Sequence, residues 1–262
     1  MTCARQRLPC SIGGMMISAG IDIGSRTVKL ALASEGEVIL SRKVMNTHNP
    51  LETCIQLLDG VEYDSLTATG YGRHLISNYL PCSVVSEIKA FAAGARYFNP
   101  DCKAILDIGG QDTKAITLDD SGNVKKFEMN DKCSAGTGRF LEIMATALGF
   151  KLEDFAAAAI SAERYEDVNS TCTVFAESEV ISLVTRGVPR NEIALGIHRS
   201  IASRSISLLK RVQVQGNIFF AGGVAFNRCM RMLVEEGMCC GVFIPDDPQI
   251  TGAAGCALIN SR

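Results

Sequence analysis

The sequence predicts an α/β fold built from two similar halves that face each other. Short apolar runs with strand character alternate with amphipathic runs of helical length, which is the pattern of α/β proteins. One short motif occurs twice, as Asp22-Ile23-Gly24-Ser25 and as Asp107-Ile108-Gly109-Gly110, and a lysine stands at the same spacing after each aspartate. Two copies of one strand-turn-strand unit indicate a repeated half.

The individual elements follow from hydrophobic periodicity and from turn residues. Each copy of the motif is expected to be the turn of a β-hairpin, with second strands at residues 28–33 and 115–118. Between the hairpins, the pattern predicts a helix at 50–58, a strand at 65–70 and a helix at 87–97. After the second hairpin, it predicts helices at 138–148, 152–159, 175–185 and 191–212, strands at 217–221 and 242–245, and a last helix at 252–259.

Length and charge restrict the class of protein. The chain has 262 residues, a net charge of −2 and 47% hydrophobic residues, which is typical of a globular protein without a nucleic-acid-binding surface. No apolar run approaches the roughly 20 residues of a membrane helix, and residues 1–16 lack the apolar segment of a secretory signal. We therefore expect a cytoplasmic protein with a disordered extension at 1–16, a first half at 17–100 and a second half at 101–262.

The chain has 11 cysteines, and without an export signal we expect reduced thiols rather than a disulfide framework. Free cysteine usually behaves as a small buried hydrophobic residue. We expect this role for Cys54, Cys82, Cys102, Cys229, Cys239, Cys240 and Cys256.

The repeated motif has the residue types that hold phosphate and Mg²⁺. Backbone N–H groups of a Gly-Ser turn approach an anion closely, a lysine adds positive charge, and an aspartate holds Mg²⁺ through water. A glutamine such as Gln111 can orient an attacking water. We therefore assign catalysis to Asp22, Asp107 and Gln111, and nucleotide contacts to Gly24, Ser25, Arg26, Lys29, Gly109, Gly110 and Asp112. The alternative is a purely structural hairpin repeat.

Two further cysteines stand in polar turns. Cys133 lies shortly before Gly136-Thr137-Gly138, a glycine-rich turn that opens a helix and could also hold phosphate, and Cys172 lies in a similar turn before another predicted helix. The positive end of a helix favours thiolate over thiol. Zinc and iron–sulfur sites normally need four ligands, so a second copy of the chain would have to complete the set. Zinc, an iron–sulfur cluster and a simple buried thiol all remain open from these residues alone.

The order of these parts, ending with FAGGVAFN at residues 220–227, resembles the actin-like ATPase superfamily. This resemblance implies two ribonuclease-H-like halves around a nucleotide cleft, with Gly222, Gly223 and Asn227 against adenosine. The segments NDKCSAGTGRFLE, NSTCTVFAESEVISL, TGYGR and PDDPQITGAAGCALI resemble the BadF/BadG/BcrA/BcrD ATPase family, in particular the activators of 2-hydroxyacyl-CoA dehydratases. The resemblance covers residues 17–262.

The family resemblance implies a homodimer in which one bridging [4Fe–4S] cluster is held by Cys133 and Cys172 of both chains. It implies ATP or ADP with Mg²⁺, and nucleotide contacts at Gly136 and Gly138. The expected activity is ATP-dependent one-electron donation, from ferredoxin or flavodoxin to a partner iron–sulfur dehydratase of 2-hydroxyacyl-CoA. An ATPase subunit of a benzoyl-CoA-type reductase, a small-molecule kinase of the same fold and a zinc-bridged dimer are the alternatives.

Overall fold

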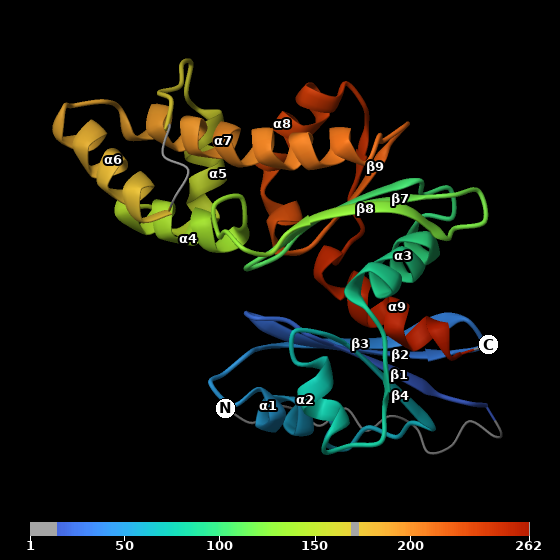
Figure 1. The fold of residues 1–262 in the computed structure, drawn as a ribbon. Coiled ribbons are helices and arrows are strands. Elements are labelled where there is room, and N and C mark those ends of the chain that lie inside the picture. The colour runs from blue at the N-terminus through green and yellow to red at the C-terminus, as the bar shows by residue number, and fades with distance from the viewer. Residues whose placement is uncertain (1–14, 169–172, 262) are drawn as a thin grey trace.

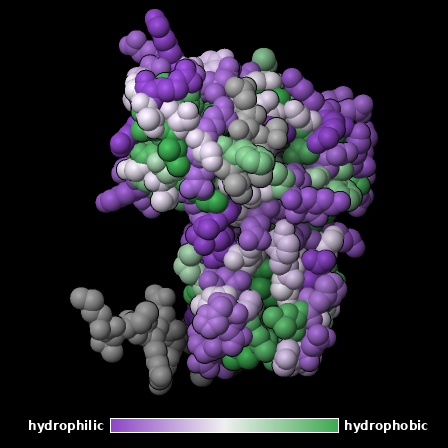
Figure 2. Space-filling model, turned by 60° about the vertical axis from the view of Figure 1, so that its left-hand side comes forward, coloured by the Kyte–Doolittle hydropathy of each residue, from purple (hydrophilic) through white to green (hydrophobic). Residues whose placement is uncertain are grey.

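The computed structural model describes residues 15–168 and 173–261 as two halves stacked on each other (Figure 1). Most of the expected disordered extension at 1–16 and the predicted cluster ligand Cys172 lie outside these residues. Figure 2 shows the larger second half above the smaller first half, with a narrower region between them. Each half contains one five-stranded sheet.

The two sheets have the same topology, which explains the repeated motif. In the first half, β1 (Ser18–Ile23), β2 (Thr27–Ser34) and β3 (Glu37–Met45) are antiparallel neighbours, and β4 (Ser65–Gly70) and β5 (Ser83–Val84) extend the sheet in parallel. The second half repeats this order with the strands β6 (Ala104–Ile108), β7 (Thr113–Leu118), β8 (Val124–Asn130), β9 (Ile218–Ala221) and β10 (Val242–Phe243).

The predicted hairpins are present, and their register explains the lysine spacing. Asp22 is the cross-strand partner of Lys29, and Asp107 is the partner of Lys114. The sequence reading missed the third strand of each meander, because β3 and β8 lie at sheet edges and carry many exposed polar residues. Without a continuous apolar run, such edge strands give little sequence signal.

Two helices lie between the sheets, α3 (Glu87–Phe98) and α9 (Thr251–Ile259) (Figure 1). Helix α9 packs on β1 and β2, whereas Phe91 and Ala95 of α3 pack against the second sheet. The two helices cross closely at Gly255, where a Cβ atom would lie 1.8 Å from the carbonyl oxygen of Ala90. The division after residue 100 stays a prediction. Helix α9, although it lies at the end of the chain, packs on the first sheet.

The remaining helices pack on the sheets or on other helices. The first half has α1 (Pro50–Leu58) and α2 (Arg73–Ser77). The second half has α4 (Gly138–Ala147), α5 (Leu152–Ile160), α6 (Thr173–Thr185), α7 (Arg190–Arg211), α8 (Arg228–Met238) and the 3₁₀ helices η1 (Gly223–Phe226) and η2 (Pro248–Ile250). The sequence analysis predicted neither α2 nor α8. Helix α2 has only five residues, which is too short to show a helical period of apolar residues, and α8 begins directly after the glycine-rich segment at 220–227. No helix in the described part of the chain has the length and apolar character to cross a membrane.

The seven cysteines that were expected to be small buried residues all lie in the described part of the chain and carry free thiols. Cys54, Cys102, Cys229 and Cys256 are buried as predicted, and Cys82 and Cys240 are half-buried. The prediction is wrong for Cys239, which is exposed because it caps the C-terminus of α8 with a left-handed backbone (φ 51°).

Candidate functional site

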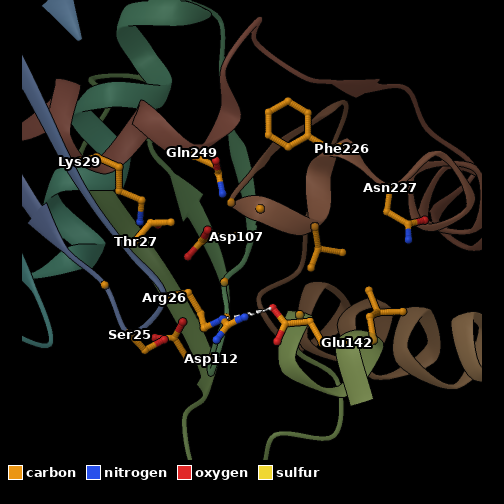
Figure 3. A pocket seen from close by; sticks show the side chains of 18 of the residues that line it. Ser25, Arg26, Thr27, Lys29, Asp107, Asp112, Glu142, Phe226, Asn227 and Gln249 are labelled. Atoms are coloured by element: carbon orange, nitrogen blue, oxygen red, sulfur yellow. Dashed lines mark hydrogen bonds and ion pairs between the residues drawn. The ribbon is translucent and has the colours of Figure 1, made fainter. Parts of the chain in front are cut away.

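A cavity of about 380 Å³ lies between the two halves, where both repeated turns meet (Figure 3). Most of the predicted nucleotide and catalytic residues line it, although they come from distant parts of the sequence. They are Asp22, Gly24, Ser25, Arg26, Lys29, Asp107, Gly109, Gly110, Asp112, Gly138, Gly222, Gly223 and Asn227.

The two glycine turns touch each other at the cavity. In the first turn, the Gly24 amide donates to the carbonyl of Thr27 at 3.1 Å. A Cβ atom on Gly110 of the second turn would lie 2.6 Å from Cγ of Arg26 and 3.1 Å from Oγ of Ser25. A larger residue at position 110 would have to displace the Arg26 side chain, so glycine permits this close approach. A phosphate chain could therefore contact both halves at once.

A buried lysine organises the carboxylates of the site. Nζ of Lys114 lies 2.7 Å from Oε2 of Glu87, 2.7 Å from Oδ2 of Asp112 and 3.1 Å from Oδ2 of Asp107, and only 2% of its side chain is exposed. Lys29 forms a simpler pair with Asp22, at 3.2 Å. The lysine cluster holds three carboxyl groups around one ammonium group.

Burial controls the protonation of this cluster. Burial raises the pKa of Asp107 to about 6, against the lowering effect of Lys114, and burial also raises the pKa of Glu87. Burial alone would lower the pKa of Lys114, but the surrounding carboxylates outweigh it and raise that pKa well above its ordinary value. Carboxyl groups with raised pKa values are suited to accept a proton near neutral pH.

The sequence reading assigned no role to Glu87 or Lys114, which both line the cavity. The matched spacing of Lys29 and Lys114 after their aspartates was the available signal for Lys114. The segment Glu87-Ile88-Lys89-Ala90 also resembles the family, but this resemblance gave Glu87 no role, because it reaches the site only through the packing of α3 between the sheets.

Two predicted residues lie away from the cavity lining. Gln111 is exposed at the second turn. Gly136 has a left-handed backbone (φ 109°), and its carbonyl accepts a hydrogen bond of 2.8 Å from the hydroxyl of Thr113. The structure therefore gives Gly136 a role in the turn, and the catalytic role of Gln111 stays a prediction.

The opposite end of the cavity is largely apolar and suits a nucleobase. Gly222 has φ 84°, and a Cβ atom there would lie 2.4 Å from the carbonyl oxygen of Ile108. This tight turn places η1 against the cavity. The apolar side chains at this end belong to Leu141, Leu152, Ala156, Val224 and Phe226.

Asn227 lines the cavity but its side chain serves the fold. Its Oδ1 accepts the amide of Met230 at 3.0 Å and thereby caps α8, and its Nδ2 donates to Nε2 of His198 at 3.0 Å. Burial lowers the pKa of His198 to about 4, which keeps this ring neutral as the acceptor. Both polar groups of Asn227 are therefore occupied.

Backbone hydrogen bonds join the second glycine turn directly to α4. The amides of Gly138 and Arg139 donate to the carbonyls of Gly109 and Gly110, both at 2.9 Å. Since Gly138 opens α4, these two hydrogen bonds join the second glycine turn to the start of this helix. Cys133 lies in the turn that precedes it.

The turn before α4 also meets the start of α6. Cys133 is exposed, and its carbonyl accepts Nδ2 of Asn130 at 2.9 Å. The hydroxyls of Ser134 and Thr173 lie 2.8 Å apart. Ser134 directly follows the predicted cluster ligand Cys133 in the sequence, and Thr173 directly follows Cys172. Cys172 itself lies outside the described residues. Within the described residues, no group of three or more His, Cys, Asp and Glu side chains could hold a metal ion.

Known proteins of one family resemble the chain over nearly its full length. Residues 19–260 match the BadF/BadG/BcrA/BcrD ATPase family. An activator of lactoyl-CoA dehydratase from Anaerotignum propionicum is 40% identical over 252 residues, which are 93% of this chain and 96% of the relative. A (R)-2-hydroxyglutaryl-CoA dehydratase activating ATPase from Acidaminococcus fermentans is 39% identical over 250 residues, which are 91% of this chain and 95% of the relative.

Solved structures confirm the predicted fold class. The activator of the 2-hydroxyisocaproyl-CoA dehydratase from Clostridium difficile, with bound ADPNP, has a TM-score of 0.84 at 36% identity, covering 93% of this chain and 94% of that one. A ROK family glucokinase from Streptomyces griseus has a TM-score of 0.59 at 12% identity, covering 94% of this chain and 99% of that one, and shows the fold alone.

Proposed function

The chain belongs to the BadF/BadG/BcrA/BcrD ATPase family, and from this we propose that it is an ATP-hydrolysing activator of a 2-hydroxyacyl-CoA dehydratase. The observation that best supports this proposal is the pair of backbone hydrogen bonds between α4 and the second glycine turn. These hydrogen bonds join a nucleotide-sized cavity to the turn that holds Cys133. The small-molecule kinase alternative gives no reason for the pair of turn cysteines, Cys133 and Cys172.

ATP is proposed to lie along the cavity with its base at the apolar end and its phosphates over the two glycine turns. The amides around Gly24 and Gly109 would face the phosphates, as in other anion-binding turns. Mg²⁺ would be held by phosphate oxygens and by waters next to Asp22 and Asp107. This arrangement fits the cavity of about 380 Å³ and the excess of carboxylates around Lys114.

Hydrolysis needs a group that orients the attacking water. Glu87 and Asp107 line the cavity, and both have raised pKa values because they are buried. Lys114 contacts both carboxylates and fixes their positions. We assign the orientation of the water to these two carboxylates, with the exposed Gln111 as the other candidate.

The electron-transfer part of the proposal concerns Cys133 and Cys172. In a homodimer these cysteines would supply four thiolates, and a bridging [4Fe–4S] cluster held there would supply one-electron chemistry. The exposure of Cys133 and the contact between Ser134 and Thr173 support this placement. A ferredoxin or flavodoxin would deliver the electron, and a partner iron–sulfur dehydratase would receive it.

An activation assay under strictly anaerobic conditions tests this function. The full chain is reduced with dithionite, mixed with a 2-hydroxyacyl-CoA dehydratase and ATP, and the dehydration of lactoyl-CoA is followed. Dehydration should require ATP and should be lost in Cys133→Ala, while this variant still binds ATP. Cys239→Ala is the matched control, because it removes another exposed thiol. ATP-independent activation, or full activation by Cys133→Ala, would overturn the proposal.

A further inference from the structure

An ion pair crosses the cavity from the first half to α4 (Figure 3). Nε and Nη2 of Arg26 donate to Oε1 of Glu142, at 3.2 and 2.9 Å. Arg26 belongs to the first glycine turn, directly after Ser25, and Glu142 lies in α4. Both residues line the cavity. The pair is therefore a direct contact between the first phosphate turn and the helix that follows the Cys133 turn.

Glu142 has a second partner on its own helix. Nη1 of Arg139 donates to Oε2 of Glu142 at 2.9 Å, so each carboxylate oxygen is engaged by a different arginine. Side-chain exposure is 44% for Arg26, 46% for Arg139 and 24% for Glu142. If Arg26 left, Glu142 would keep a charged partner and would still be reached by solvent. The pair can therefore open without leaving a buried unpaired charge.

Arg26 also lies where a terminal phosphate would arrive. Its side chain passes over Gly110, where an added Cβ atom would lie 2.6 Å from Cγ of Arg26. The neighbouring groups on this side of the cavity are the turn amides and Ser25, which suit phosphate oxygens. A guanidinium group prefers a phosphate bearing more than one negative charge to a single carboxylate that another arginine already neutralises.

We propose that Arg26 exchanges Glu142 for the γ-phosphate when ATP binds, so that this ion pair is a nucleotide-sensitive contact between the first half and α4. The inference rests on the proposed function, since it places ATP in this cavity. With ADP, the Arg26–Glu142 pair stays closed and holds α4 to the first turn. With ATP, α4 loses the ion pair to the first turn but keeps its hydrogen bonds to the second turn, so it can move with the second turn.

The test is calorimetric titration of the full anaerobic protein with ADPNP and with ADP, both in the presence of Mg²⁺. Arg26→Ala should weaken ADPNP binding about tenfold and change ADP binding little. Glu142→Gln should tighten ADPNP binding about two- to fivefold and leave ADP binding unchanged, because the competitor for Arg26 is gone. The double variant should match Arg26→Ala.

Glu235→Gln is the control, because the Arg231–Glu235 pair on α8 has a similar length (3.1 Å) and exposure (49% and 32%). It should change neither affinity. Weaker or unchanged ADPNP binding in Glu142→Gln would overturn the proposal that Arg26 exchanges its partner. Equal losses of ADP and ADPNP affinity in Arg26→Ala would also overturn it. If the unmodified protein bound neither nucleotide, the proposed function itself would fail.

Hydrogen exchange of α4 gives a second readout. ADPNP should raise exchange at residues 138–147 relative to ADP in the unmodified protein, and Arg26→Ala should remove this difference. If ADPNP still raised hydrogen exchange at residues 138–147 in Arg26→Ala, this would contradict the proposal, even if the variant bound ADPNP more weakly.

Discussion

Replacing Lys114 with methionine should strongly destabilise the protein. Methionine keeps the length and apolar stem of the side chain but removes the ammonium group that neutralises Glu87, Asp107 and Asp112 at 2.7 to 3.1 Å. The side chain is 2% exposed, so the carboxylates would be left buried without a cation. Removing one partner of a buried ion pair costs about 3–5 kcal/mol. We expect a loss of this size in the free energy of unfolding at neutral pH.

The loss should shrink as the pH falls. Burial already raises the pKa of Asp107 from 3.8 to about 6, and removing Lys114 would raise it further. A carboxyl group whose pKa is higher in the folded state binds its proton more tightly there, so it contributes stability at low pH that is lost as the pH rises through the folded-state pKa. Lys114 stays charged over the same range, because its pKa is raised well above 10.5. The variant should therefore recover stability between about pH 7 and pH 5.

Urea unfolding followed by far-ultraviolet circular dichroism measures this effect, since the chain has no tryptophan for fluorescence. Lys43→Met is the matched control. Lys43 pairs with Asp247 at 2.8 Å, but the two side chains are 40% and 34% exposed, so the expected loss is below about 1 kcal/mol. Equal losses in both variants, or a loss for Lys114→Met that is the same at both pH values, would refute the reasoning.

Three further substitutions test the site and the packing around it. Asn227→Ala should lower the free energy of unfolding by about 1–3 kcal/mol in urea titrations, because it removes the cap of α8 and a buried hydrogen bond; an unchanged midpoint would contradict this role. Gly138→Ala should weaken ATP binding in calorimetry, because its Cβ atom would lie 3.0 Å from the carbonyl oxygen of Gly109; unaltered affinity would argue against the bonded turn. Gly255→Ala should destabilise the protein by at least about 1–3 kcal/mol, because its Cβ atom would lie 1.8 Å from the carbonyl oxygen of Ala90; a thermal midpoint equal to that of the unmodified protein would show that α3 and α9 separate without cost.

Features encoded within a short stretch of sequence could be predicted. The repeated turns were recognisable because the apolar strand, the glycine and the lysine follow one another within a few residues. The register of each hairpin then fixes the pairs Asp22–Lys29 and Asp107–Lys114. Helix α1 matches the prediction at both ends, and its start is set locally by Asn49, which caps the helix, and Pro50 at its first position.

Features that depend on long-range packing could not be predicted. Glu87 joins Lys114 only because α3 packs between the two sheets. Asn227 carries the motif position expected for a nucleotide contact, yet its hydrogen bonds go to α7 and α8. The Arg26–Glu142 pair joins residues from the two halves, and no local pattern relates them.

The iron content of the anaerobically purified protein tests the central claim most directly, namely that the two turn cysteines of each chain hold a redox centre next to the nucleotide site. The account predicts about four iron atoms per two chains, bleached by dithionite, with loss of iron in Cys133→Ala and in Cys172→Ala and retention in Cys239→Ala. An iron-free protein, or a full iron complement in either turn variant, would contradict it.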